Sequence, residues 1–306
     1  SDVHGFIGPT DYMSPNSNLP LGLERAATCL RHEQHAASHS LTFDDGDYLE
    51  GSPLTYYLKM VAHQSAPRAL DQAFNQIHYD IGIVGNHEFN YGSDYLKRSI
   101  RESRRTFLCA NVIDDRGQHP FGRPYLIKNV AGVKIGIIGL VTQNCPEWED
   151  PEHIRGLRFI SAFRSLKKYV PIVKQQSDVV VVSYHGGFER DAHGQPIWAQ
   201  NGENEGYRIL KNIHGIDAML TGHQHWRLAG HLFGVPYVQP GKQGRFVGKI
   251  TLNLAPDHHV ISSRAELIPT RKCSLDPRVK AAIQPTQDRV RKWLNTPLCR
   301  IAGSFS

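Results

Sequence analysis

The sequence predicts a layered α/β fold, and three observations on its 306 residues support that prediction. Short runs rich in Val and Ile, typical of buried strands, recur along the chain. Between these runs, apolar residues recur at helical spacing. With 40% hydrophobic and 21% charged residues, the composition is that of an ordinary folded domain, which excludes collagen-like, coiled-coil and disordered chains. Strands and helices that alternate in this way form a sheet covered by helices.

The expected elements follow one another along most of the chain. Two apolar runs near the C-terminal end, 246–254 and 259–269, are joined by a short turn and are expected to pair as an antiparallel hairpin, so the sheet is mixed. The earlier strands are expected at 40–43, 81–84, 134–141, 178–184, 217–221 and 235–240, and the helices at 21–37, 54–63, 66–76, 93–102, 162–175 and 204–213.

The segment from Arg264 to Arg300 is basic, with nine Lys or Arg against three Asp or Glu, and it accounts for the net charge of +6. We expect a solvated tail there, in which Pro285 opens a helix that runs to about Leu294, because proline is tolerated in a first turn. No basic patch is interleaved with aromatic residues, so stable nucleic-acid binding is not expected. The sequence thus predicts one domain over residues 1–270 and a tail or linker over residues 271–306.

Membrane spans and cysteine frameworks are not expected. No run approaches the roughly 18 uninterrupted apolar residues that a span requires, and the first residues lack the pattern of a signal sequence. The residues alone therefore leave the localisation open. The five cysteines include no C-x-x-C pair, which disfavours a disulfide framework and a thiolate zinc site.

Polar groups that can bind metals follow the ends of the expected strands. Gly46 and Asp47 follow one strand, Asn86 follows the next, and His185 follows a third. In an open α/β sheet these carboxyl ends form one crevice, where ligands bind. Each group alone is weak support, since a single histidine is commonly a capping or surface residue. The whole set is Asp2, His4, Asp47, Asn86, His185, His223 and His225.

These seven side chains offer only oxygen and imidazole nitrogen, and they are more than one ion needs. Two divalent metal ions are therefore expected, with Asp47 as the bridging carboxylate, because two-metal sites activate water and neutralise a phosphoryl group. The absence of thiolate favours Mn, Zn, Fe, Co or Ni without distinguishing among them.

The ordered blocks Asp-x-His, Gly-Asp, Gly-Asn-His-Glu, His and Gly-His-x-His resemble those of the calcineurin-like metallophosphoesterases. Longer strings, among them GDYLEGSPLTYYL, GNHEFNYGSDYL, NGEN and GIDAMLTGHQH, resemble the 2',3'-cyclic-nucleotide 2'-phosphodiesterase/3'-nucleotidase branch of the 5'-nucleotidase family. The resemblance covers nearly the whole chain. It implies a four-layer α/β/β/α sandwich with mixed sheets.

The resemblance also assigns roles to the site residues. It implies that His87 contacts the substrate phosphate together with Asn86, and that Asn90 pairs with His87 where 5'-nucleotidases typically have Asp. The amide favours an imidazolium less than a carboxylate does, and the NHEFNYG string favours the cyclic substrate. One implied metal site contains Asp2, His4, Asp47 and His225, and the other contains Asp47, Asn86, His185 and His223.

The implied activity is hydrolysis of 2',3'-cyclic nucleotides to 3'-nucleotides and then to nucleosides, in the periplasm or outside the cell. A 5'-nucleotidase, a nucleotide-sugar hydrolase and a non-catalytic metal-binding module remain alternatives. In the family a strand precedes the Asp-x-His block, so that strand is expected to be missing here. The family's C-terminal nucleotide-binding domain, which holds the base, is also expected to lie outside this chain. A base pocket within the chain would involve Tyr12, Tyr48 and Tyr91.

Overall fold

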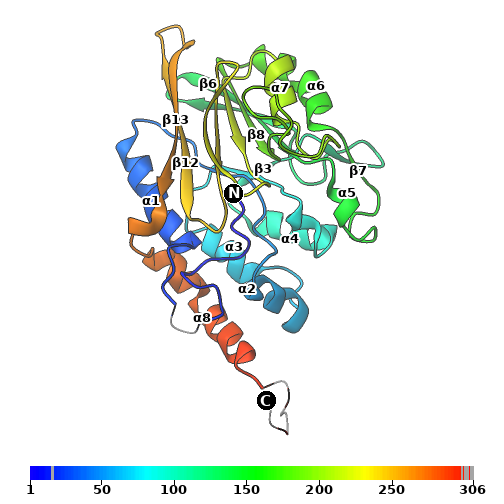
Figure 1. The fold of residues 1–306 in the computed structure, drawn as a ribbon, viewed down its shortest axis with the longest axis vertical. Helices are drawn as coiled ribbons and strands as arrows, with labels where there is room; N and C mark the ends of the chain where they lie inside the picture. The colour runs from blue at the N-terminus through cyan, green and yellow to red at the C-terminus, as the bar shows by residue number, and fades with distance from the viewer. Residues whose placement is uncertain (15–16, 298, 300–302, 304–306) are drawn as a thin grey trace.

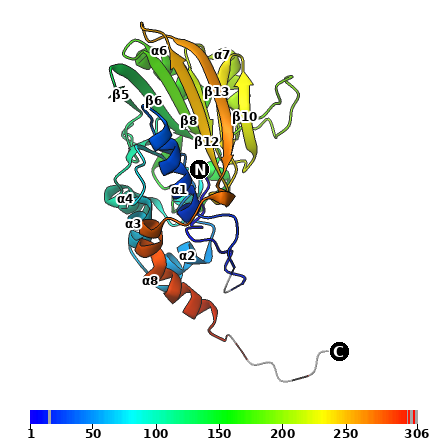
Figure 2. The same ribbon diagram turned by 90° about the vertical axis from the view of Figure 1, so that its left-hand side faces the viewer.

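The computed structural model describes residues 1–14, 17–297, 299 and 303, and in these residues the chain forms four layers (Figure 1). Two layers of strands lie face to face in the middle, and helices cover both outer faces. The chain begins between the layers, and the last helix runs away from the strands (Figure 2). This arrangement is the predicted α/β/β/α sandwich.

The larger strand layer is a six-stranded mixed sheet in the order β10-β11-β9-β8-β6-β5. Its central strand, β8, is buried along its whole length. Val180 and Val182 pack against the outer helices, whereas Val179 and Val181 face the second strand layer. A strand buried on both faces needs a continuous apolar run, which is why the sequence there reads VVVV. The strands are β5 (Tyr125–Val130), β6 (Val133–Val141), β8 (Val179–His185), β9 (Ala218–Thr221), β10 (Arg227–Leu232) and β11 (Val235–Pro240).

The second strand layer combines a short parallel sheet with the predicted hairpin. The parallel sheet consists of β1 (Phe43–Asp44), β2 (Ile81–Ile83) and β3 (Thr106–Leu108), in that order. The hairpin consists of β12 (Phe246–Leu254) and β13 (Val260–Pro269). Both pack apolar side chains against the six-stranded sheet. A separate antiparallel pair joins β4 (Val112–Asp114) to β7 (Leu157–Phe159).

The helices cover the outer faces of the two strand layers. On the six-stranded sheet lie α6 (Ala162–Lys174) and α7 (Gly206–Asn212). On the other side the core gathers side chains from α1, α3, α4 and α8. These helices and the short ones nearby are α1 (Leu23–Ala36), α2 (Pro53–Tyr56) with the π-helix Tyr57–Val61, α3 (Arg68–Phe74), α4 (Ser93–Glu102), α5 (Cys145–Trp148) and α8 (Pro277–Leu294).

The C-terminal helix differs from the expectation of a solvated tail. Helix α8 begins at Pro277, capped by the Asp276 side chain, and Pro285 lies inside it rather than opening it. Val279, Ile283 and Val290 are fully buried in the core shared with α1 and α3. Its basic side chains lie on the exposed face. The segment is therefore an amphipathic helix, which its basic composition did not indicate. The last positions of the predicted tail, 300–302 and 304–306, lie outside the described residues.

The expected strands and helices are otherwise present, with shifted ends. The strand predicted at 40–43 is the shorter β1, and the sequence pattern missed β3, β4, β5, β7 and β10. Cys29 and Cys109 are buried and free, as predicted. None of the described helices is both long and apolar enough to cross a bilayer.

Candidate active site

The predicted metal-binding side chains meet where the parallel strands end. Asp47 follows β1, Asn86 follows β2, and His185 is the last residue of β8. His223 and His225 follow β9. Because the strands of both layers deliver their carboxyl ends to the same region, loops far apart in the sequence converge there.

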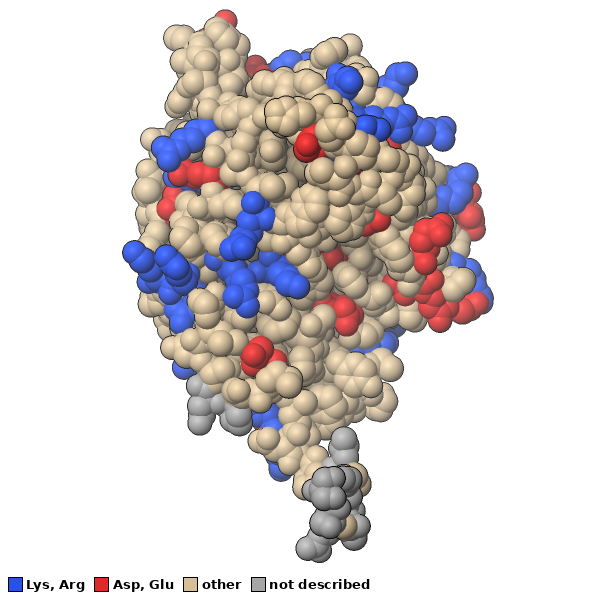
Figure 3. Space-filling model, viewed as in Figure 1, with Lys and Arg blue, Asp and Glu red and all other residues tan. Residues whose placement is uncertain are grey.

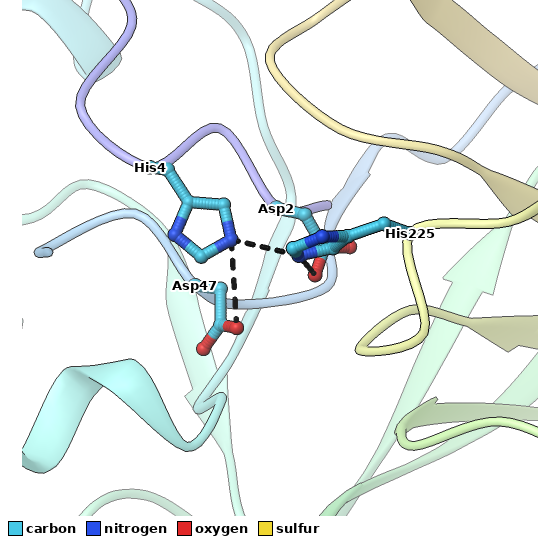
Figure 4. Close-up of side chains that lie close together, drawn as sticks. All are labelled: Asp2, His4, Asp47 and His225. Carbon is cyan, nitrogen blue, oxygen red and sulfur yellow. Dashed lines mark hydrogen bonds and ion pairs between the residues drawn. The ribbon is translucent and has the colours of Figure 1, made fainter. Parts of the chain in front are cut away.

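Asp2, His4, Asp47 and His225 form one compact group (Figure 4). Each offers one ligand atom, and these atoms lie within 4.8 Å of one another. The Nε2 atom of His4 lies 3.0 Å from Nε2 of His225 and 3.8 Å from Oδ2 of Asp47. Nε2 of His225 lies 3.5 Å from Oδ1 of Asp2. Imidazole and carboxylate groups at this spacing can hold a divalent cation.

The other predicted ligands adjoin this group through Asp47. Nε2 of His185 lies 3.1 Å from Oδ2 of Asp47. Nδ1 of His223 lies 2.9 Å from Oδ1 of Asn86, and the rings of His185 and His223 lie 5.7 Å apart. The backbone N–H of His87 donates to Oδ1 of Asp47, at 2.8 Å. Asp47 therefore lies between the two groups, as a bridging ligand must.

The unpaired atom of His185 fits a metal ligand. Its Nδ1 bonds to the backbone carbonyl of Asp45, which orients the ring. Its Nε2 is buried and lies 3.1 Å from Oδ2 of Asp47, but it makes no hydrogen bond to the described residues. A buried nitrogen without a partner is costly, and a cation at this position would satisfy it. The oxygen and nitrogen donors match the divalent metals predicted from the sequence.

Burial and neighbouring charges shift the pKa values of these groups in opposite directions. Burial alone raises the pKa of Asp47, but the adjacent His185 and His87 outweigh it and hold the pKa well below its ordinary value. Burial alone lowers the pKa of His185, yet Asp47 and Asp2 raise it well above the ordinary range. For His4 burial prevails, and its pKa is lowered.

The ligand loops hold a strained backbone. A positive φ is uncommon outside glycine and clusters at functional sites. Glu88 supports the loops, because its buried carboxylate accepts backbone N–H bonds from Asp47 at 2.7 Å and Gly85 at 2.5 Å. A Cβ atom on Gly85 would lie 2.6 Å from the Asp47 nitrogen, so only glycine fits there. The ligands with positive φ, between 51° and 69°, are Asp2, His4, Asp47, His223 and His225.

His87 and Asn90 form the predicted pair. The Nδ1 atom of His87 lies 2.6 Å from Oδ1 of Asn90, and the Glu50 carboxylate lies 3.4 Å from the same nitrogen. Burial alone lowers the pKa of His87, but Asp47, the bond to Asn90 and the Glu50 charge raise it above its ordinary value. A partly exposed imidazole of this kind can stabilise charge or donate a proton.

A cavity of about 290 Å³ opens beside the pair, lined by residues that include Asn86, His87 and Trp148. The Trp148 ring is 49% exposed and stacks on His223, with ring centroids 5.5 Å apart. Acidic side chains gather on the side of the molecule where α5 lies (Figure 3). This charge disfavours binding of a polyanionic nucleic acid there.

Several polar residues at the site were missed by the sequence analysis. Glu88 stands within the Asn-His-Glu string and Glu203 within the NGEN string, so the motifs contained them without indicating a role. Glu203 Oε1 lies 2.9 Å from Nε2 of His223. Tyr48, considered for a base pocket, is fully buried and bonds to Ser99, so it cannot contact a base.

Comparisons with known proteins identify the family of this chain. Residues 1–227 match the family model described as calcineurin-like phosphoesterase. The chain is 28% identical to a 2',3'-cyclic-nucleotide 2'-phosphodiesterase/3'-nucleotidase of Salmonella typhimurium, with 100% of this chain and 52% of that protein covered. A protein of the same name from Haemophilus influenzae is 27% identical, with 97% and 50% covered. The chain thus spans about half the length of these relatives.

Solved structures show the same fold. A candidate 5'-nucleotidase from Staphylococcus aureus superposes with a TM-score of 0.87 at 37% identity, covering 94% of this chain and 57% of that one. The calcineurin-like phosphoesterase YfkN from Bacillus subtilis superposes with a TM-score of 0.84 at 26% identity, covering 96% and 97%.

Proposed function

Because the chain belongs to the calcineurin-like phosphoesterase family, we propose that it hydrolyses 2',3'-cyclic nucleotides to 3'-nucleotides, and these to nucleosides. The observation that carries this proposal is the pairing of His87 with an amide, Asn90, beside a complete set of metal-competent side chains. Relatives named for this two-step activity align with nearly all of the chain. Asn90 stands where the sequence analysis noted Asp in typical 5'-nucleotidases.

The proposal assigns two divalent ions to the site, one held by Asp2, His4, Asp47 and His225 and the other by Asp47, Asn86, His185 and His223. When bound, such ions activate water and neutralise charge on the phosphoryl group. The proposed role of His87 is to contact the phosphate from the cavity side, with Asn90 holding its ring. There it stabilises charge that develops on phosphoryl oxygens or donates a proton to the leaving oxygen.

Two wider features belong to the same proposal. A second domain that binds the base is part of the proposal, supported by relatives that are about twice as long as this chain. The proposed location is the periplasm or the outside of the cell, as the family resemblance implies. A 5'-nucleotidase is the second candidate, favoured by the similarity to the Staphylococcus aureus protein.

The test is a substrate panel on the chain loaded with manganese or zinc. We expect cleavage of bis(p-nitrophenyl) phosphate, and turnover of 2',3'-cyclic AMP, GMP, CMP and UMP with high KM and little discrimination among them. Without contacts to the base, remote binding energy cannot position the phosphorus. Release of phosphate from 5'-AMP alone would favour the second candidate. Bound metal without any turnover would favour a non-catalytic module, and tight, base-selective turnover would place the base pocket inside this chain.

A further inference from the structure

The Asn90 side chain lies between His87 and a second acidic group, Glu149. Asn90 Nδ2 donates to Oε2 of Glu149 at 2.9 Å, while Asn90 Oδ1 lies 2.6 Å from Nδ1 of His87. Glu149 directly follows α5 and is 59 residues away in the sequence. Its side chain is only 7% exposed.

We infer that Glu149 is a positioning residue that fixes the direction of the Asn90 amide and, through it, the tautomer of His87. An asparagine can present either its oxygen or its nitrogen to a neighbour. If the Asn90 amide were turned around, its oxygen would face a carboxylate oxygen of Glu149, and two acceptors cannot form a hydrogen bond. The amide oxygen therefore faces His87, and only a protonated Nδ1 can donate to it.

This constraint acts together with the Glu50 carboxylate, which lies 3.4 Å from the same Nδ1, and both favour Nε2 as the nitrogen that serves the substrate. With Nδ1 protonated and bonded to Asn90, Nε2 is the nitrogen that carries the lone pair in the neutral ring and donates in the charged ring. A carboxylate at position 90 would accept a hydrogen bond in either orientation, whereas an amide needs a third group to orient it. Glu149 supplies that group.

The other carboxylate oxygen of Glu149 holds the local turn. Oε1 lies 2.9 Å from Nδ1 of His153 and accepts from the backbone N–H of Asp150 at 3.0 Å. The two oxygens thus have separate partners, which allows their roles to be separated by mutation. His153→Ala removes a contact to Oε1 and leaves the bond to Asn90 intact.

The inference rests on the proposed function for its kinetic test, which uses 2',3'-cyclic AMP as the probe. Glu149→Ala is expected to lower kcat about 10-fold to 100-fold, the usual scale for a group that orients an active-site residue. KM and bound metal should stay close to the wild-type values, because the side-chain hydrogen bonds of Glu149 go to Asn90, Asp150 and His153 and to none of the proposed metal ligands. Glu149→Gln should also lower kcat, because its amide can donate to Asn90 Oδ1 as readily as accept from Asn90 Nδ2, so that the Asn90 amide is no longer held in one direction. His153→Ala and the exposed Glu147→Ala serve as matched controls and should retain wild-type kcat.

A spectroscopic measurement keeps this inference separate from the substrate assignment. In the metal-free chain at alkaline pH, the ¹⁵N signals of His87 should show the Nδ1-protonated tautomer, and Glu149→Ala should give a mixture of tautomers. If the wild type does not cleave the cyclic nucleotide, the proposed substrate is wrong, and the tautomer result still decides this inference. Unchanged kcat and tautomer in Glu149→Ala, a Gln variant with wild-type kcat and tautomer, or an equal loss in His153→Ala would each overturn it.

Discussion

Asp44 and Asp47 lie three residues apart at the end of β1, and both are almost fully buried, with 0% and 1% of their surface exposed. Asp44 forms an ion pair with Arg105, a residue of the same chain. Asp47 instead faces His185 and His4 at the ligand cluster. The first charge is balanced by a residue inside the protein, whereas the second lies in a group of side chains that could hold a metal ion.

The surroundings of the two aspartates differ accordingly. The Arg105 guanidinium lies over the rings of Tyr48, Phe74 and Phe107, at 4.3, 4.6 and 4.9 Å. These rings belong to the core that the helices cover. Around Asp47, by contrast, the neighbours are histidines and strained loops. Burial of a carboxylate therefore does not by itself identify a functional site. The chemical nature of the groups that face the carboxylate is more informative.

The largest effect is expected at the ligand cluster. Asp47→Ala should remove both metal sites and lower phosphodiesterase activity by about 1000-fold or more, because several kcal/mol of charge stabilisation depend on the ions. Elemental analysis and kinetics measure the two effects. The exposed Asp94→Ala is the matched control. Two tightly bound ions per chain in Asp47→Ala would show that the bridge assignment is wrong.

Substitutions in the ion pair of Asp44 with Arg105 should change the stability of the protein rather than its metal content. Arg105→Met leaves a buried carboxylate without its partner and should lower the free energy of unfolding by about 3–5 kcal/mol. Urea denaturation measures this loss. The double variant Asp44→Leu/Arg105→Met should recover much of it, because no charge then stays buried alone. A loss below about 1 kcal/mol in the single variant would contradict this comparison.

Asp71 represents a third case, a buried carboxylate held by a hydroxyl. Its Oδ1 accepts from Ser99, and burial raises its pKa to about 7. Between pH 4 and 7 the folded state therefore binds the extra proton, so its stabilising contribution is lost as pH rises through about 7. Between pH 5 and pH 8 we expect this group to lower the free energy of unfolding by about 3 kcal/mol. Asp71→Asn should remove that part of the pH dependence in urea denaturation; equal slopes for both proteins would refute it.

The smallest of these effects is expected at His87, for which we propose contact with the phosphate rather than with a metal ion. His87→Ala should keep both metals while kcat falls by roughly a hundredfold, the scale for losing a general acid or an oxyanion donor. Metal analysis and kinetics on the same sample test this, with the exposed His78→Ala as control. Loss of metal together with activity would place His87 among the ligands, and an unchanged kcat would remove it from the reaction.

The sequence by itself predicted the central strands of the six-stranded sheet, the hairpin, and the types and order of the proposed ligands, but it missed β3, β4, β5, β7 and β10. The run from Val179 to Val182 is typical of a buried strand, and every proposed ligand block except that of Asp2 and His4 follows an expected strand, so local pattern predicted the approximate place of these blocks. The same local reasoning failed at α8, where nine basic residues against three acidic in the C-terminal segment masked an apolar face. The charge of each residue can be read from the sequence, whereas the face that a helix buries depends on the elements against which it packs.

Only the tertiary structure decided which polar groups pair. Glu149 meets Asn90 across 59 residues, and Arg105 meets Asp44 across 61. Neither contact can be read from the sequence pattern, because the neighbouring residues do not determine which partner a single carboxylate or guanidinium faces. The chain must first bring the strand ends and α5 together, and the cost of burying an unpaired charge then selects the partner that lies within reach.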